Sequence, residues 1–204
     1  MLANLNEFTF SAYFFADSSQ TGFSNIVQQD PGGVGSFYIR YEYGLSDFIY
    51  SFHCGSSSSA LSIAASSGGF SVPSVNAWHH VALTYDGTIA SAYLDGVLLG
   101  SDSVIGPLSN FNSVPFYIGN WQLQENFNGN IDDVHIWDVA LSESDIQEYL
   151  DCSPVGVESG LVGYWNFEEG IGSIVYDQTS NGNDGIINGA TYDTNVPTQS
   201  CNLI

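Results

Sequence analysis

Short stretches in which polar and apolar residues alternate, each ended by turn residues, recur along almost the whole chain and limit its fold more than any other feature. Two of the turns are Asp86-Gly87 and Asp95-Gly96, a dipeptide typical of β-hairpins. Alternation of this kind indicates strands with one buried face. The stretches are 7–15, 36–43, 48–52, 78–85, 90–94, 97–100, 115–119 and 129–137. So many short strands predict an all-β fold of two packed antiparallel sheets.

One segment has helical spacing instead. Ser142 can cap a helix, with Asp145 at the third helical position of a capping box. Ile146, Tyr149 and Leu150 then form a short apolar stripe. We therefore predict one short helix beside the strands.

The last fifty or so residues differ from the rest, so the chain divides into a sandwich over 1–152 and a tail over 153–204. The tail has two expected strands, at 161–167 and 185–192. Two strands are too few to fold alone. They must pair with the sandwich, with a following module or with another molecule.

Three cysteines are present, and Cys152 and Cys201 bracket the tail. A disulfide between them would close a loop of about fifty residues and stabilise the fold by about 4 kcal/mol. Cys54 would then be a buried apolar side chain. The alternative is three free, buried thiols.

The charge balance excludes several kinds of partner. The chain has 22 Asp and Glu residues, one cation (Arg40) and a formal net charge of −21. Nothing here can neutralise the phosphates of a nucleic acid or an anionic membrane surface, and no apolar run reaches the roughly 20 residues of a membrane helix. With only 11% charged residues and much Gly, Ser and Asn, we expect a secreted or cell-surface protein. No signal peptide opens the chain and a strand begins at once, so we expect an excerpt of a longer protein.

Four motifs resemble, in order and spacing, the laminin-G-like, concanavalin A-like modules of secreted bacterial proteins. They are 76–87, 93–96, 117–120 and 128–142. The resemblance covers about residues 7–150 and implies a jelly-roll sandwich that binds carbohydrate or mediates adhesion. Residues 162–170 and 177–185 look like the family's opening strands, which normally precede the main body. Because the strand that usually joins the two parts is missing, we expect the tail to dock on the same sandwich or, alternatively, to begin another module.

The resemblance also implies a structural calcium ion. Asp132 matches the family position best, and Asn130 and the Gly129 carbonyl lie close to it. Asp177 and Asp184 could add oxygen ligands if the tail docks, since calcium takes six to eight oxygens. The alternative is that Asp132 caps a turn by accepting backbone hydrogen bonds.

Sugar binding needs flat apolar faces beside amides and carboxylates, and two places offer them. The first is a loop containing Trp121, Gln122, Glu125 and Phe127. The second is the pair Tyr41 and Tyr43, next to Arg40. The alternative at both places is packing, because aromatic residues make up 14% of the chain.

An enzymatic function is not expected. Residues 143–148 have the spelling of the carboxylate motif of retaining β-glucanases. That chemistry needs two carboxyls about 5 Å apart across the sugar, whereas a helix turns such side chains away from each other. We therefore expect a noncatalytic module that binds polysaccharide or cell-surface glycan. The alternative is a structural repeat or filament subunit whose edge strands pair with neighbouring modules or with copies of itself.

Overall fold

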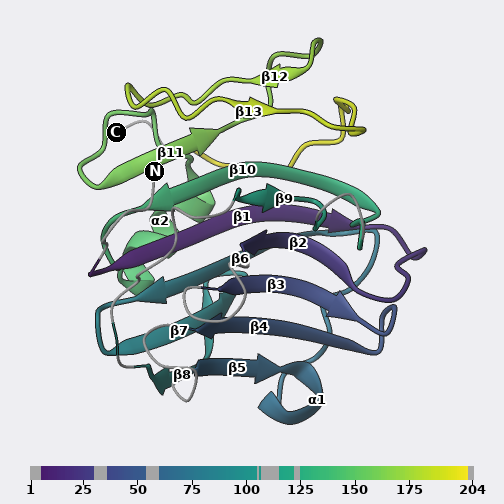
Figure 1. Cartoon of the computed structure of the whole chain (residues 1–204), viewed down its shortest axis with the longest axis vertical. Helices are drawn as coiled ribbons and strands as arrows, with labels where there is room; N and C mark the ends of the chain where they lie inside the picture. Colours follow the sequence, from purple (N-terminus) through teal and green to yellow (C-terminus); the bar gives the residue numbers. More distant parts are fainter. Residues whose placement is uncertain are drawn as a thin grey trace.

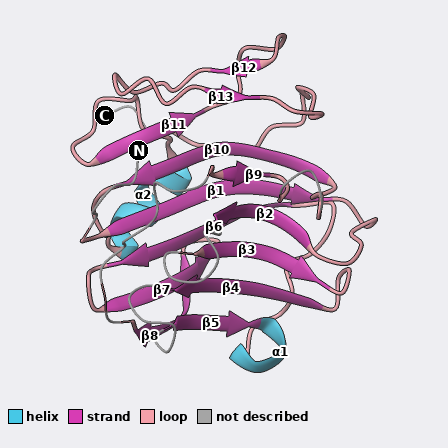
Figure 2. Cartoon of the chain, in the orientation of Figure 1, coloured by secondary structure: helices cyan, strands magenta, loops and turns pink. Residues whose placement is uncertain are grey.

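The computed structural model describes residues 6–29, 36–53, 60–104, 106, 115–121 and 125–201. Two large antiparallel sheets face each other (Figures 1 and 2). One has the order β11 (Leu161–Trp165), β10 (Gly129–Trp137), β1 (Phe8–Ala16), β6 (Trp78–Tyr85), β7 (Ile89–Leu94), β8 (Val97–Ser103). The other has the order β5 (Ala60–Ala64), β4 (Asp47–His53), β3 (Phe37–Glu42), β2 (Ser24–Gln29), β9 (Tyr117–Ile118). The predicted all-β jelly-roll sandwich is confirmed.

The core between the sheets is mostly aromatic. On β1 every second residue, including Phe10 and Phe14, is fully buried in it. Side chains of the opposite sheet pack against them. The ring centroids of Phe10 and Phe37 lie 5.9 Å apart, and those of Phe14 and Phe48 lie 5.7 Å apart. Burying one such side chain stabilises the fold by about 1.5–3 kcal/mol. This packing fixes how the two sheets lie against each other.

The outer face of the six-stranded sheet is covered by helix α2 (Glu143–Asp151). The predicted capping box is present, because Ser142 and Asp145 each accept a hydrogen bond from the other's backbone N–H. Ile146 is buried against Tyr93, and the Tyr149 ring lies 4.8 Å from that of Trp137. No helix in the described ranges is long and apolar enough to cross a membrane.

The tail, residues 153–204, extends the six-stranded sheet at its β10 edge. β11 pairs with β10, and the short strands β12 (Ile174–Val175) and β13 (Gly185–Ile186) lie beyond it, at the top of Figure 1. The predicted disulfide joins Cys152, at the end of α2, to Cys201. The side chain of Asn195 accepts a hydrogen bond from Trp78 Nε1 of β6.

The outer edge of β11 is covered by residues 176–184, which we call the edge loop. Val162 O accepts the side-chain amides of Asn181 (3.0 Å) and Asn183 (2.9 Å). Tyr164 O accepts the backbone N–H of Gln178. Side chains and backbone of the edge loop thus take the positions that another strand would occupy.

Some elements differ from the prediction. β2 and β5 were not expected, and neither were β12 and the one-turn helix α1 (Ala65–Gly68). β2 lacks clean alternation because Ile26 and Val27 are both in the core, next to a register shift between Asn25 and Val27. The strand expected over 185–192 is only two residues long.

Candidate functional site

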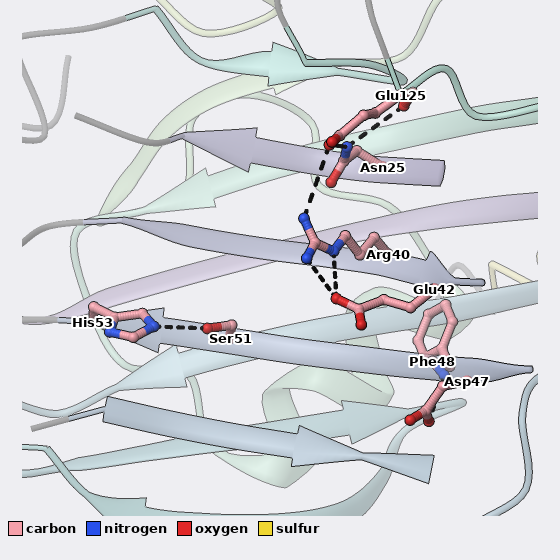
Figure 3. A network of polar contacts seen from close by, with 8 residues as sticks. All are labelled: Asn25, Arg40, Glu42, Asp47, Phe48, Ser51, His53 and Glu125. Atoms are coloured by element: carbon pink, nitrogen blue, oxygen red, sulfur yellow. Dashed lines mark hydrogen bonds and ion pairs between the residues drawn. The ribbon is translucent and has the colours of Figure 1, made fainter. Parts of the chain in front are cut away.

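A polar network lies on the outer face of the five-stranded sheet (Figure 3). Ile39 and Tyr41 of β3 are fully buried in the core. Because side chains of a strand alternate between faces, Tyr38, Arg40 and Glu42 point outward. Figure 3 shows Arg40 at the centre of this face, between Glu42 of its own strand and Glu125 from the loop beyond β2.

Arg40 is held on every side. Its guanidinium carbon lies 4.3 Å from the centre of the Phe23 ring and 4.0 Å from that of Tyr38. Nε donates to Glu42 Oε1 at 2.8 Å and Nη2 donates to the same oxygen, while Nη1 lies 3.9 Å from Glu125 Oε2. The side chain is only 14% exposed. Its charge is therefore neutralised inside the protein, and it fixes two rings and two carboxylates around it.

Two residues beside Arg40 have left-handed backbone conformations, Tyr43 with φ 51° and Glu125 with φ 54°. Such conformations cost a non-glycine residue on the order of 1–3 kcal/mol and persist where the surroundings impose them. Asn25 holds Glu125, because Asn25 Nδ2 donates to Glu125 Oε2 at 2.9 Å. Tyr43 starts the turn after β3, which leaves its ring 72% exposed and 5.8 Å from Phe23.

We call this surface the Arg40 face; its members are Phe23, Tyr38, Arg40, Glu42, Tyr43 and Glu125. A shallow depression adjoins it, lined by Thr21, Gly22, Phe23, Glu125, Asn126 and Asn128. The surface thus combines one exposed aromatic ring, that of Tyr43, and two half-buried rings with fixed carboxylate and amide groups. Rings can stack on the apolar faces of sugars, and the polar groups can accept or donate hydrogen bonds to hydroxyls.

The structure divides the predicted ligand-binding residues. Tyr43 and Glu125 come together on the Arg40 face, although they are far apart in sequence. Tyr41 and Phe127 are a correction: both are buried in the core, with stacked rings 6.5 Å apart, so neither presents a face to a ligand. Trp121 is half-buried just after β9. Gln122 lies outside the described residues.

Sequence reasoning missed Phe23, Tyr38 and Asn25. Alternation along β3 carried a signal for Tyr38, because a residue two positions before Arg40 must share its face. Phe23 precedes a strand that was itself not predicted. Its place beside Arg40 follows only from the pairing of β2 with β3, in which Ser24 lies opposite Tyr41.

The proposed calcium position carries two neighbouring acidic residues. The register of β10 against β1 shifts here, and Asp133 has φ 46°. Asp132 and Asp133 are only 8% and 9% exposed. Burial, and next the charge of Asp133, raises the pKa of Asp132 to about 7. Burial also raises the pKa of Asp133, although Tyr164 and Gln199 donate hydrogen bonds to its carboxylate.

The other predicted calcium ligands serve the backbone. Asp177 accepts the N–H groups of Tyr164 (3.1 Å) and Thr179 (2.9 Å) on one oxygen, and that of Asn183 (2.9 Å) on the other. Asp184 accepts the N–H of Asp177. These carboxylates build the edge loop and hold it on β11.

Gly129 and Asn130 also have structural contacts. A Cβ at Gly129 would lie 1.9 Å from the carbonyl oxygen of Phe15, so only glycine allows β1 and β10 to approach here. Asn130 donates to the carbonyl of Asn195. Within the described ranges, no three Asp, Glu, His or Cys side chains form a group that could hold a metal. Calcium binding at Asp132, with Asn130, Gly129, Asp177 and Asp184, therefore stays a prediction of the sequence.

Replacing Asp132 with asparagine is expected to stabilise the protein at pH 8 by roughly 2 kcal/mol, about half of the cost of ionising a carboxyl whose pKa is raised by about three units. The raised pKa means that the wild type loses stability as pH rises through about 7. Because this loss accumulates between the ordinary carboxyl pKa near 4 and about 7, the gain should fall by more than half at pH 5. Denaturant melts at both pH values measure it, with Asp138→Asn, at an exposed position, as the control. A gain of equal size at both pH values would contradict the assignment.

A family model for the concanavalin A-like lectin/glucanases superfamily matches residues 1–147. No curated protein matches the chain. A candidate carbohydrate-binding protein from Bacteroides ovatus has a similar structure, with 18% identity, a TM-score of 0.69, and coverage of 93% of this chain and 56% of that one. The chain thus spans little more than half of the Bacteroides protein.

Two further solved structures are similar. Domain 4 of an extracellular GH43 arabinanase from Geobacillus stearothermophilus, in complex with arabinotriose, has 18% identity and a TM-score of 0.53, covering 72% of this chain and 68% of that one. The CBM40 of a Ruminococcus gnavus IT-sialidase, bound to α2,3-sialyllactose, has 12% identity and a TM-score of 0.54, covering 72% and 83%. At these identities the likeness establishes the fold alone.

Proposed function

Because the chain belongs to the concanavalin A-like lectin/glucanases superfamily, we propose that it is a noncatalytic carbohydrate-binding module of a secreted or cell-surface protein. The observation that carries the proposal is the Arg40 face, where an exposed tyrosine, a second ring and fixed carboxylates meet beside a shallow depression. The oligosaccharides bound to two of the similar structures support the same role. A disulfide is typical of proteins outside the reducing cytosol.

The glucanase-like spelling at 143–148 gives no support to a catalytic role. Glu143 and Glu148 lie on α2, five residues apart, so their side chains diverge around the helix axis. The helix also covers the outer face of the six-stranded sheet, whereas Arg40 lies on the outer face of the five-stranded sheet, on the other side of the sandwich. Two carboxyls facing each other across a sugar, as retaining hydrolysis requires, do not arise from this segment.

The alternative function, assembly through edge strands, finds no open edge at β11. An unpaired edge is needed to add a strand from another chain. At β11 the edge loop already occupies the carbonyls of Val162 and Tyr164.

Replacing Tyr43 with alanine is expected to weaken glycan binding about tenfold, since an aromatic platform in a binding site contributes roughly 1–2 kcal/mol. Because the ring is 72% exposed, the melting temperature should stay unchanged. Affinity electrophoresis in gels containing soluble polysaccharides measures the effect. Tyr176→Ala, which removes a 52% exposed tyrosine from the tail, is the matched control. Equal retention of both variants would count against the Arg40 face as the binding site.

A further inference from the structure

We infer that the Arg40 face selects uncharged glycans and rejects glycans that carry uronate, sulfate or sialate groups. The inference rests on the proposed function and specifies the ligand class of the same site. It follows from the ion pairs that Arg40, the only arginine or lysine of the face, makes with Glu42 and Glu125.

Recognition of an anionic sugar needs an accessible cation whose charge is not already compensated, and Arg40 is only 14% exposed and paired with two carboxylates. A guanidinium offers five N–H donors in one plane. Here Nε and Nη2 are directed to Glu42, and Nη1 faces Glu125. Phe23 and Tyr38 cover its two flat sides. A carboxylate or sulfate on a ligand would have to displace one of the protein's own carboxylates to reach it.

No other lysine or arginine can take its place. Arg40 is the only Lys or Arg in the sequence. His53, on the same face, is paired with Ser51, and His79 is paired with Asp95. His80 and His135 are buried under the opposite face.

The surrounding charge works in the same direction. Glu42 and Glu125 flank Arg40, so the immediate surface has one more negative than positive charge. The chain as a whole has a formal net charge of −21. An anionic group arriving here meets repulsion without compensation, whereas hydroxyl groups can still donate hydrogen bonds to the carboxylate oxygens.

The test compares matched glycan pairs on the full chain at 0.15 M salt. Suitable pairs are lactose with 3′-sialyllactose, galactose oligomers with galacturonate oligomers, and neutral with sulfated galactan oligomers, all printed on one array. We expect binding to neutral members, with the anionic partner weaker by roughly tenfold or more, the effect of one repulsive charge pair near a surface. The difference should shrink at 1 M salt because the repulsion is screened.

A double variant, Glu42→Gln with Glu125→Gln, frees the guanidinium while keeping side-chain shape. It is expected to reduce the neutral-over-anionic preference by about tenfold or more. Glu143→Gln with Glu148→Gln removes the same charge from α2 and should leave the preference unchanged. Melting curves of both variants verify that they are folded.

The outcomes separate the two proposals. Preferred binding of an anionic member by the wild type would overturn this inference and leave the carbohydrate-binding function standing. A preference that both double variants share would overturn the role given to the Arg40 ion pairs. Absence of binding to every neutral and anionic glycan would overturn the proposed function, and this inference with it.

Discussion

Replacing Asp177 with alanine is expected to lower the free energy of unfolding by about 3 kcal/mol or more. Its carboxylate accepts three backbone N–H groups, from Tyr164, Thr179 and Asn183. A buried donor that loses its acceptor costs about 1–3 kcal/mol, and water can reach only part of this site because Asp177 is 9% exposed. The edge loop should detach from β11 before the sandwich unfolds. Denaturant melts measure the loss in stability.

Calcium distinguishes the two roles considered for this residue. If Asp177 serves the backbone, the loss of stability should be the same with calcium and with chelator. A loss that appears only with calcium would instead make Asp177 a metal ligand. Asp177→Asn should be intermediate, because the amide keeps one acceptor oxygen. The control is Asp193→Ala, an exposed aspartate that accepts a backbone N–H from Asn195. Its loss should stay near 1 kcal/mol.

Acid is expected to destabilise the protein through two buried histidines beneath α2. His80 and His135 are 1% and 0% exposed. Neither ring nitrogen of His80 has a hydrogen-bond partner in the described part of the chain, and Nδ1 of His135 contacts Ser11 Oγ at 3.1 Å. Burial lowers the pKa of His80 to about 4 and that of His135 to about 3, with the neighbouring His80 also lowering the latter.

The sign follows from the lowered pKa values. A histidine in the unfolded chain has a pKa near 6.5, whereas the two buried rings of the folded protein have lower pKa values and bind a proton only at lower pH. Stability is therefore full above pH 6.5 and falls as the pH drops toward 4. For His80 alone the loss is about 3 kcal/mol by pH 4. Asp132 has the opposite sign, because its raised pKa favours the folded state as the pH falls below about 7.

The experiment uses an Asp132→Asn background, so that the histidines dominate the pH dependence. Melting temperatures from pH 7 to 4 should fall steeply there. Adding His80→Phe, which keeps a flat ring beside Tyr13, should remove about half of the slope. His53→Phe, on the opposite outer face, controls for the loss of one imidazole and should leave the slope intact. A slope unchanged by His80→Phe would refute the assignment.

The sequence predicts those strands in which residues facing the core alternate with residues facing outward. β1, β3, β6 and β10 alternate along most of their length, and the capped helix has a local signature. β2 escapes because its buried polar residues Gln28 and Gln29 and its bulge hide the pattern. β5 escapes because Ala and Ser residues give little contrast between faces.

The candidate site was predictable only in part, for physical reasons. Tyr43 and Glu125 were identified by type, but which neighbours share their face depends on strand pairing. Tyr41 was wrong because it lies one residue from Arg40 and so points into the core. Asp177 shows a different difficulty. A carboxylate among Gly and Asn residues has the same spelling whether it binds a metal or backbone amides, and only its hydrogen bonds distinguish the two.

The Arg40 ion pairs have one more consequence, for proteolysis. Trypsin-like proteases cut after lysine or arginine, and this chain offers them a single bond, between Arg40 and Tyr41. That bond lies inside β3, which is paired on both sides, and the arginine that a protease must bind is already stacked and ion-paired. Cleavage therefore requires opening of the five-stranded sheet, and its rate reports that opening. Such a module would resist trypsin-like proteases for as long as the middle of its sheet stays closed.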